Sequence, residues 1–310
     1  MKLARYRSGR DGHVHVGAVV VDERDDVELV ASLGSGTGRE GQSLLLAMAM
    51  ARDLGSMDCD DPEPIADVTL LTPVPEPPSI RDFYAFEAHV ATARRTRGLE
   101  MEPDWYELPV FYFTNPAAVL GPSEALHPPA TSELDYELEV AAVVGVECAD
   151  LDEREWLDVV AGFTVMNDWS ARDLQRREMA LGLGPSKGKD FATSLGPMLV
   201  TPDELVGGDG VARGVMTASV NGQEWSRGEL GDMHHGWGRL LAHASRSTVL
   251  RPGDVIGSGT VGSGCILELG PVHGRDRYPW LQAGDEVTLA VEGIGSLTNR
   301  VATPSSSAVR

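Results

Sequence analysis

The sequence predicts an α+β protein that is rich in β-structure, with a large β domain preceded by a small α/β domain. From about residue 75 onward, short alternating stretches typical of strands are separated by Gly, Pro and Asp turn residues. Helical patterns are few in that part, roughly 80–97, 152–161 and 168–180. Six prolines between positions 62 and 78 indicate an extended, irregular connector rather than regular structure, and we place the domain boundary there.

The first 55 residues form the small α/β unit of this prediction. VHVGAVVVD (14–22) is typical of a strand, and SLLLAMAMARDLG (43–55) of a helix that ends at Gly55. Between them, GSGTGREG (34–41) lacks the Lys-Ser/Thr ending of a Walker motif and an evident strand–loop–helix fingerprint, so we expect a flexible loop. The expected division is a small domain with its connector over 1–74, a catalytic domain over 75–302 and a flexible tail over 303–310.

Within the large domain, turn residues precede several alternating stretches. MTASVNGQEWS (216–226) has Asn-Gly between strand-like flanks, which predicts a hairpin with a type I′ turn. LRPGDVIGSG (250–259) and LQAGDEVTLAVEG (281–293) each place a Gly-Asp turn ahead of a strand.

Composition excludes several classes of partner. The chain has 47 acidic and 26 basic residues, a formal net charge of −21, whereas nucleic acid or an anionic membrane would need a basic patch. No apolar run approaches the roughly 20 residues of a membrane span, and charges occupy the N-terminus where a signal peptide is apolar, so we expect a cytoplasmic protein. Three widely spaced cysteines, Cys59, Cys148 and Cys265, predict neither disulfides nor a zinc site.

The segment ELDYELEVAAVVG (133–145) alternates acidic and apolar residues with a period of two, which is typical of a strand. One face would carry Leu134, Tyr136, Leu138 and Val140, and the other Glu133, Asp135, Glu137 and Glu139. A solvated edge strand can carry such acids without any function. The apolar run that follows instead indicates a central strand, in which buried carboxylates need a cation or hydrogen-bond donors.

Two further segments place an acidic residue near other side chains that could take part in catalysis or binding. In SIRDFYAFEAHVATARR, a helix over 80–97 would put Asp82 and His89 on one face, two turns apart. Such a histidine is commonly a core residue, although the carboxylate keeps a catalytic role open. In AGFTVMNDWSARDLQRRE, Asp168 ends a strand and can cap the following helix, which explains it without further function. Arg172 and Gln175 would then share its helix face.

Oxygen ligands from these segments suit a hard divalent cation, Mg²⁺, Ca²⁺ or Mn²⁺, rather than zinc. The four carboxylates that could form such a site are Asp82, Glu137, Glu139 and Asp168. Spacing alone leaves open whether they converge.

From about residue 75 to 302, the chain resembles the fumarylacetoacetate hydrolase family. The matching segments occur in the family's order: DFYAFEAHV, DYELEVAAVVG, GFTVMNDWSARDLQ, GKDFATSLGP, RPGDVIGSGTV and GDEVTLAVEGIGSLTNRV. The resemblance implies a large domain of the family's mixed β-sandwich roll type, a homodimer and a bound divalent metal, with Mg²⁺ the first choice.

The resemblance also implies roles for single residues. The metal ligands would be Asp82, Glu137, Glu139 and Asp168, and the catalytic residues His89 as base, Glu268 as the acid that orients it and Lys189 as the active-site lysine. Substrate contacts are implied for Tyr84, Tyr112, Gln175 and Thr260, and Arg172 adds positive charge for an anionic substrate.

The sequence departs from the family's pattern at three places. The arginine expected about nine residues after His89 falls on Gly98, so Arg97 or a shifted loop would substitute for it. Met179 stands where the hydrolase that names the family has a tyrosine, and the stretch between Thr260 and Glu268 is shorter. These departures concern the substrate more than the reaction type.

The implied activity is metal-dependent hydrolysis of a C–C bond in a 1,3-dicarbonyl compound, such as fumarylacetoacetate or an acylpyruvate. His89 would activate water, and the metal would stabilise the enolate leaving group. The same site also suits a 2-oxo acid decarboxylase, a hydroxydienoate isomerase or a sugar-acid dehydratase, which need no attack by water. A non-catalytic protein with a structural ion would have no need for His89, Glu268 and Lys189 together.

We expect a small oxo-acid or diketone substrate. Trp225 and Trp237 serve either a dimer interface or the core.

Overall fold

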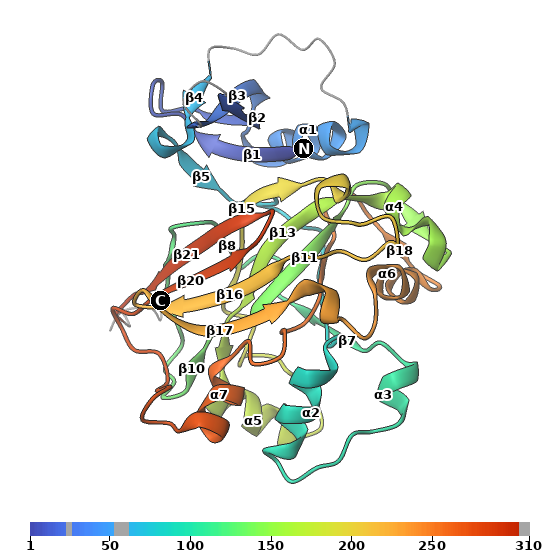
Figure 1. Cartoon of the computed structure of the whole chain (residues 1–310), viewed down its shortest axis with the longest axis vertical. Helices are drawn as coiled ribbons and strands as arrows, with labels where there is room; N and C mark the ends of the chain where they lie inside the picture. Colours follow the sequence, from blue (N-terminus) through green and yellow to red (C-terminus); the bar gives the residue numbers. More distant parts are fainter. Residues whose placement is uncertain (23–26, 53–61, 304–310) are drawn as a thin grey trace.

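Two β-sheets pack face to face in the computed structural model, which describes residues 1–22, 27–52 and 62–303 (Figure 1). The larger sheet has twelve strands in the order β4-β3-β2-β1-β15-β13-β11-β19-β6-β7, with β5 on β1 and β8 on β15. Its strands are β1 (Lys2–Arg7), β2 (Val14–Asp22), β3 (Val27–Ser35), β4 (Glu63–Pro64), β5 (Thr69–Leu71), β6 (Ile80–Phe83), β7 (Phe111–Thr114), β8 (Val119–Leu120), β11 (Leu138–Val144), β13 (Val160–Asp168), β15 (Thr193–Val200) and β19 (Val255–Gly257).

The second sheet has five strands in the order β17-β16-β20-β21-β9, and two short ladders complete the β-structure. The five strands are β9 (Ala125–Leu126), β16 (Val215–Val220), β17 (Gln223–Glu229), β20 (Glu286–Val291) and β21 (Gly295–Val301). The ladders pair β10 (Leu134–Asp135) with β14 (Ser170–Ala171) and β12 (Cys148–Ala149) with β18 (Val249–Leu250).

The α-helices cover the outside and one end of this sandwich (Figure 1). In chain order they are α1 (Gly38–Ala51), α2 (Glu87–Arg95), α3 (Asp104–Glu107), α4 (Trp156–Val159), α5 (Arg172–Ala180), α6 (Trp237–Ser245) and α7 (Ile266–His273). Helices α2, α5 and α7 lie together at the end of the sandwich opposite α1 (Figure 1). No helix in the described ranges is long and apolar enough to cross a membrane.

The side chains of strand β11 point alternately into two hydrophobic cores, one on each face of the large sheet. Val140 and Ala142 belong to the core between the sheets, whereas Ala141 and Val143 pack toward α1 on the other face. All seven residues of β11 are buried, because β13 and β19 flank the strand. The predicted central strand is confirmed, although the ladder is interrupted at residues 136–137.

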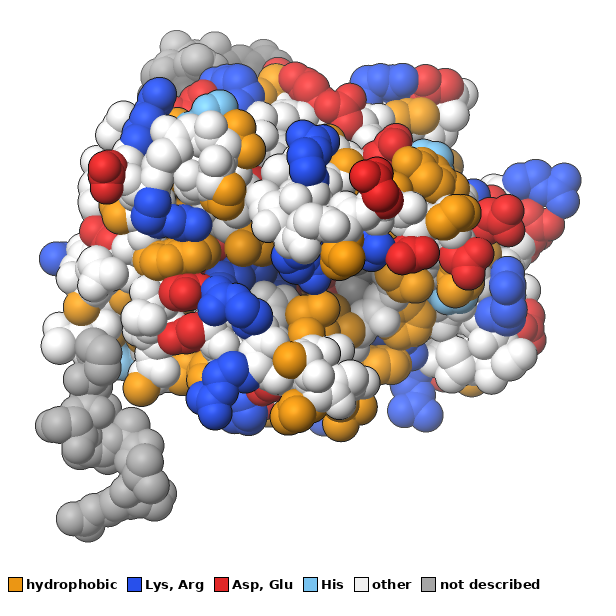
Figure 2. Space-filling view, turned by 90° about the horizontal axis from the view of Figure 1, so that it is seen from below, with side chains coloured by type: hydrophobic (Ala, Val, Ile, Leu, Met, Phe, Trp, Pro, Cys, Tyr) orange, Lys and Arg blue, Asp and Glu red, His pale blue; other side chains and the backbone are white. Residues whose placement is uncertain are grey.

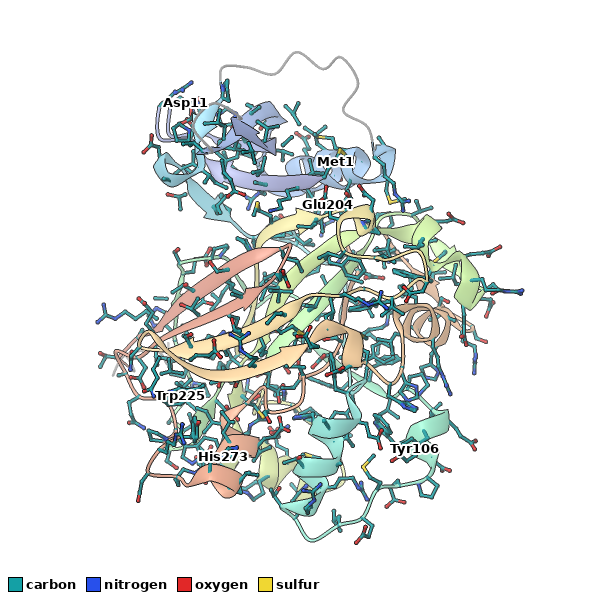
Figure 3. All side chains as sticks on the ribbon, in the orientation of Figure 1. Met1, Asp11, Tyr106, Glu204, Trp225 and His273 are labelled. Atoms are coloured by element: carbon teal, nitrogen blue, oxygen red, sulfur yellow. The ribbon has the colours of Figure 1, made fainter. Side chains whose placement is uncertain are left out.

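The described residues among the first 71 do not form a sheet of their own. Strand β1 pairs with β2 and β5, and also with β15 of the large domain through Lys2↔Val200. The amino group of Met1 donates to the Glu204 carboxylate at 2.9 Å (Figure 3). The predicted boundary near residue 75 therefore separates parts that share one continuous sheet, and the division into domains stays a prediction.

Two expectations for this region are wrong. The connector was expected to be irregular, but it contains β4, a 3₁₀ turn (Ile65–Asp67) and β5; Pro64 is tolerated because β4 is an edge strand. The expected flexible loop over 34–41 is a tight join between β3 and α1, where a Cβ on Gly36 would lie 2.5 Å from the backbone of His15. Gly55, Cys59 and residues 304–310 lie outside the described ranges.

Elsewhere, local signals are confirmed where turn chemistry is strong. Asn221 and Gly222 have φ of 50° and 78°, as the predicted type I′ turn between β16 and β17 requires. The helix expected over 152–161 is a 3₁₀ turn followed by α4, and β13 begins at Val160. Trp237 is 3% exposed and packs on Phe163, so it cannot serve a dimer interface as an exposed aromatic.

Candidate active site

Four carboxylates meet at the end of the sandwich where neighbouring strands of the large sheet stop. Asp82 lies on β6, Glu139 on β11 and Asp168 at the last position of β13, and Glu137 directly precedes β11. Antiparallel pairing of Leu138 with Asn167 brings the start of β11 beside the end of β13. Oxygen atoms of Asp82, Glu137 and Asp168 all lie within 4.8 Å of one another. Long-range strand pairing thus gathers acids that are far apart in sequence.

The helix predicted over 80–97 is wrong at its start. Residues 80–83 form β6, which pairs with β19 and β7, and α2 begins only at Glu87. Asp82 therefore lies on a strand and His89 on a helix, and the two do not share a helix face. The predicted N-cap role of Asp168 is also wrong, because α5 begins at Arg172 after Ala171 and Asp168 belongs to β13.

Cations hold one side of the carboxylate cluster. The ammonium of Lys189 donates to Glu137 and Asp168, and Nη2 of Arg172 donates to Glu137 Oε1 at 2.8 Å. Burial alone would raise the pKa of Glu137, but Lys189 and Arg172 outweigh it and bring the pKa to about 2. Glu137 therefore stays ionised at neutral pH without any further cation.

Asp82 and Glu139, on the other side of the cluster, have no cationic partner among the described residues. Burial, and then the charge of Asp168, raises the pKa of Asp82 well above its usual range, and burial with the charge of Asp82 does the same for Glu139. Asp82 Oδ1, Glu139 Oε2 and Asp168 Oδ1 are buried and accept no hydrogen bond from the described residues. Buried anionic oxygens without donors are costly, and a hard divalent cation is the ligand they fit.

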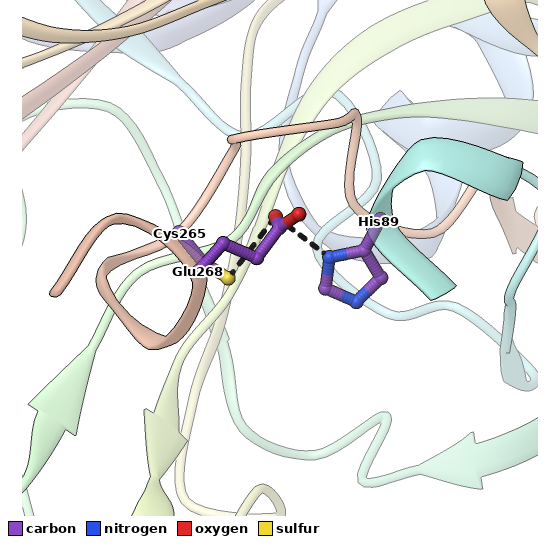
Figure 4. Close-up of side chains that lie close together, drawn as sticks. All are labelled: His89, Cys265 and Glu268. Carbon is purple, nitrogen blue, oxygen red and sulfur yellow. Dashed lines mark hydrogen bonds and ion pairs between the residues drawn. The ribbon is translucent and has the colours of Figure 1, made fainter. Parts of the chain in front are cut away.

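A histidine–glutamate pair (Figure 4) lies close enough to the cluster for His89 to lower the pKa of Glu137. His89 lies in the first turns of α2, and its Nδ1 is 2.8 Å from Glu268 Oε2. The other oxygen of Glu268 accepts from the backbone N–H of Ser263 at 3.2 Å, and the Cys265 thiol lies 3.5 Å from Oε2. Because Glu268 engages Nδ1, the Nε2 atom of the ring is left for a molecule in the cavity.

His89 lines a cavity of about 660 Å³ together with Asp82, Glu137 and Glu139, and the cavity opens between α2, α5, α7 and β7. Asp82, His89, Glu137, Glu139, Lys189 and Thr260 are each at most 5% exposed and form its floor. Val110 and Met179, by contrast, are 43% and 46% exposed and belong to its mouth. The face seen from below is hollowed near its middle, with basic side chains around the hollow and hydrophobic ones inside it (Figure 2).

The expected substrate-contact residues lie around the same cavity. Tyr84, Tyr112, Arg172, Gln175 and Thr260 all line it. The hydroxyl of Tyr112 donates to Asp168, and that of Thr260 donates to Glu139 Oε1 at 3.1 Å. Burial raises the pKa of Tyr84 to about 12, so its phenol stays protonated.

Arg172 is engaged within the protein on every side. Its Nε donates to Asp135 at 2.8 Å, and its two amino groups donate to Glu137 and to Gln175 Oε1. The predicted substrate-binding role remains a prediction, but these contacts make Arg172 first a support for Glu137. Lys189 reaches the floor because Gly188 packs on α5, where a Cβ would lie 2.7 Å from the Gln175 backbone.

Sequence reasoning overlooked several residues of the site. Asp135 had only its place in the acidic alternation to mark it, and the contact between the Cys265 thiol and Glu268 had no signal in the sequence. Among cations at the mouth, Arg94 pairs with Glu102 and Arg176 with Glu133. Arg97 has no carboxylate partner among the described residues and lies close enough to Tyr84 to lower the pKa of its phenol, against the effect of burial. Arg97 lines the cavity, and its substitution for the arginine expected at Gly98 stays a prediction.

Comparisons with known sequences agree with this site. The family model described as fumarylacetoacetate (FAA) hydrolase C-terminal matches residues 79–302. A Burkholderia cenocepacia protein named provisionally as a hydrolase is 34% identical over 196 residues, which is 62% of this chain and 65% of that protein. The oxaloacetate tautomerase YisK of Bacillus subtilis is 29% identical over 241 residues, 76% of this chain and 74% of the tautomerase. The match thus spans slightly less than two thirds of the first of these relatives.

Solved structures resemble the chain over nearly its whole length. A 5-carboxymethyl-2-hydroxymuconate delta-isomerase from Mycobacterium smegmatis covers 97% of this chain and 99% of its own, with 28% identity and a TM-score of 0.69. Fumarylacetoacetate hydrolase from Exiguobacterium antarcticum covers 98% and 99%, with 27% identity and a TM-score of 0.72.

A maleylpyruvate hydrolase from Sphingobium, in complex with manganese(II) and pyruvate, shares the fold at 22% identity and a TM-score of 0.70, over 97% of this chain and 99% of its own. With the family model covering most of the chain and the acidic cluster in place, this protein belongs to the fumarylacetoacetate hydrolase family.

Proposed function

We propose that the protein is a divalent-metal-dependent hydrolase that cleaves a C–C bond in a 1,3-dicarbonyl substrate of the fumarylacetoacetate or acylpyruvate kind. The observation that carries the proposal is the His89–Glu268 pair, with Nδ1 bonded to a carboxylate beside a cluster of buried acids. That arrangement holds the imidazole in the tautomer whose Nε2 can accept a proton. Simple binding of a metal ion would not require it.

Asp82, Glu137, Glu139 and Asp168 would hold the metal ion, and Mg²⁺ is our first choice among Mg²⁺, Ca²⁺ and Mn²⁺. The donor set is all oxygen, and three of its buried oxygen atoms lack partners among the described residues. When bound, such an ion polarises carbonyl oxygens and stabilises an enolate.

The chain's own residues supply the proton transfers and orientation in this mechanism. His89 Nε2 takes a proton from water, whose oxygen attacks the carbonyl carbon next to the bond to be broken. Glu268 stabilises the imidazolium that forms. Lys189, whose pKa its neighbours Asp168 and Glu137 raise despite burial, keeps a positive charge for the oxyanion; one such group contributes on the order of 3 kcal/mol. The C–C bond breaks, the enolate carbon takes the proton from His89, and a carboxylic acid and a ketone leave.

A second candidate is proton transfer between carbons without attack by water. It is favoured by two of the similar proteins, the delta-isomerase and the oxaloacetate tautomerase. The same His89 could move a proton from one carbon to another or between oxygen and carbon, and the same acids would serve enolate stabilisation. Decarboxylation of a 2-oxo acid and dehydration of a sugar acid need fewer of the groups present, because neither uses an activated water.

NMR product analysis in D₂O separates these reactions. The purified protein would receive an acylpyruvate and, separately, oxaloacetate, each with Mg²⁺ or with EDTA. Metal-dependent pyruvate together with the free acid from the acylpyruvate is the expected result. Faster deuterium exchange at C3 of oxaloacetate, without cleavage of either compound, would contradict the proposed hydrolysis and indicate a tautomerase instead. Pyruvate and CO₂ from oxaloacetate alone would identify a decarboxylase.

A further inference from the structure

Asp135 is a buried carboxylate behind the active site that the mechanism above does not use. It is 0% exposed and is not among the residues that line the cavity. Its Oδ1 accepts from the backbone N–H of Ile266 at 2.7 Å. Its Oδ2 accepts from the N–H of Leu267 at 3.0 Å and from Nε of Arg172 at 2.8 Å. Both oxygens therefore accept hydrogen bonds, and this one carboxylate joins the start of α5 to the start of α7.

The first of these elements leads to the carboxylate cluster. Arg172 begins α5, and the guanidinium that Asp135 holds donates through Nη2 to Glu137 Oε1 at 2.8 Å. Its Nη1 donates to Gln175 at 3.0 Å. Because a guanidinium is planar and rigid, fixing its Nε fixes the direction of both other donors. The position of Glu137 thus depends on Asp135 through one side chain.

The second element leads to the His89–Glu268 pair. Ile266 and Leu267 are the first two residues of α7, and Glu268 follows in the same turn. A carboxylate that accepts from the first N–H groups of a helix satisfies donors that have no partner within the helix and interacts well with its dipole. Asp135 anchors the turn that carries Glu268, whose Oε2 lies 2.8 Å from His89.

We propose that Asp135 is a positioning residue that couples the metal-binding carboxylates to the His89–Glu268 pair. The inference rests on the proposed function, in which the metal-binding carboxylates and the His89–Glu268 pair act in the same reaction. Asp135 holds the base and the metal ligands in one fixed relation, so that water activated by His89 meets a substrate placed by the carboxylate cluster. The alternative is that Asp135 only neutralises a buried arginine, in which case its loss would change stability alone.

Substitution by asparagine breaks this arrangement with little change of volume. An amide has one acceptor oxygen and an NH₂ that only donates, so it cannot serve Ile266, Leu267 and Arg172 at once. At least one of the two connections is lost. Arg172→Lys tests the link from the other end, because it keeps the positive charge but cannot keep all three bonds of the guanidinium.

The experiment compares wild type, Asp135→Asn, Arg172→Lys and Asp173→Asn in the full chain. Asp173 is a matched control: it lies in the first turn of α5 and its carboxylate accepts from the N–H groups of Ser132 and Leu174, without contact to His89, Glu137 or Glu268. Three quantities are measured: the downfield proton of the His89 Nδ1–H in ¹⁵N-histidine-labelled protein, the Kd for Mn²⁺, and kcat and KM on the substrate found by NMR.

For Asp135→Asn we expect the His89 proton to shift or disappear, Mn²⁺ affinity to fall about 10- to 100-fold, and kcat to fall by a similar factor with little change in KM. Arg172→Lys should shift the His89 proton although Arg172 touches neither His89 nor Glu268. Asp173→Asn should leave all three quantities near wild type.

Wild-type values of the His89 proton and the Mn²⁺ Kd in a folded Asp135→Asn protein would overturn the inference and leave Asp135 a structural residue. If that variant does not fold, the His89 proton of Arg172→Lys decides. The NMR and Mn²⁺ readouts need no turnover, so absence of cleavage on every substrate would overturn the proposed function without deciding this coupling.

Discussion

The two sides of the carboxylate cluster have the same chemistry but opposite electrostatics. On the paired side, Glu137 faces Lys189 and Arg172, and its pKa falls to about 2. On the unpaired side, Asp82 and Glu139 are as deeply buried, yet burial and mutual repulsion raise their pKa values well above the usual range. The difference comes from which elements carry the cations, since α5 and the segment before β15 reach only one side.

This contrast shows how one cluster can be both stable and ready for a ligand. The paired side is satisfied by the protein itself and contributes to folding. The unpaired side keeps buried oxygens that have no donor among the described residues, which costs stability until a cation occupies it. Variants that neutralise one carboxylate at a time should therefore act in opposite directions on the two sides.

The largest effect on stability is expected for Glu137→Gln. Breaking a buried ion pair leaves uncompensated charge and typically costs 3–5 kcal/mol; we expect about 3 kcal/mol here, because Lys189 and Arg172 each keep one other carboxylate. The measurement is urea unfolding in EDTA. Glu63→Gln is the control, a buried glutamate that accepts from the backbone of Gly9 away from the cavity. A loss no larger than that of the control would contradict the pairing.

Glu139→Gln should do the reverse. Glutamine cannot ionise, so the variant avoids the cost of deprotonating a buried carboxyl beside Asp82, and the metal-free protein should gain on the order of 1 kcal/mol at neutral pH. At the same time the loss of a proposed ligand should weaken Mn²⁺ binding on the order of 100-fold or more. Calorimetric titration and thermal unfolding in EDTA test both statements. A destabilised metal-free variant would mean that Glu139 already has a partner comparable to that of Glu137.

The two sides also predict opposite dependences of stability on pH. Glu137 has a lowered folded-state pKa, so its contribution is present above the ordinary glutamate range and is lost as pH falls from about 4.5 toward 2. Asp82 and Glu139 have raised folded-state pKa values, so stability is favoured at low pH and falls as pH rises through those values. Each kcal/mol corresponds to about 2–4 °C in Tm for chains of roughly 150–250 residues, and to less for this longer chain.

Thermal unfolding across pH, in EDTA and in Mg²⁺, checks this dependence. The loss of Tm at rising pH should be present in EDTA and reduced by Mg²⁺, because an ion would compensate the ionised carboxylates. A Tm that does not depend on Mg²⁺ at neutral pH would count against the carboxylate cluster as the metal site.

The smallest effect is expected for Thr260→Val. The hydroxyl donates to Glu139 Oε1 at 3.1 Å and orients that carboxylate. Its loss should weaken Mn²⁺ binding about 10-fold with little change in fold. Thr164→Val is the matched control, because Thr164 is fully buried and its hydroxyl has no partner among the described residues. Equal Mn²⁺ affinities in the two variants would show that Thr260 does not support Glu139.

Local sequence patterns predicted the fold well where the structure depends on a few neighbouring residues, as in an alternating strand or a tight turn. The alternation over 133–145 predicted the central strand, and Asn221-Gly222 predicted the turn. The prediction failed over 80–83, which lies in a segment with a helical pattern but forms β6, because pairing with β19 and β7 outweighs local preference. At Asp168 the predicted strand end is confirmed, since Asp168 is the last residue of β13 and pairs with Thr193, but the predicted helix cap is wrong because α5 begins only at Arg172.

The sequence by itself determined which side chains were available: the acids of the alternating strand, a histidine near Asp82, and the segments that resemble the family. Only the tertiary structure decided which of those acids have cations and which do not, and that Asp135 joins Arg172 to α7. The physical reason is that a pKa and a hydrogen bond depend on burial and on neighbours within a few ångströms, whereas these neighbours lie between 21 and 131 residues away along the chain.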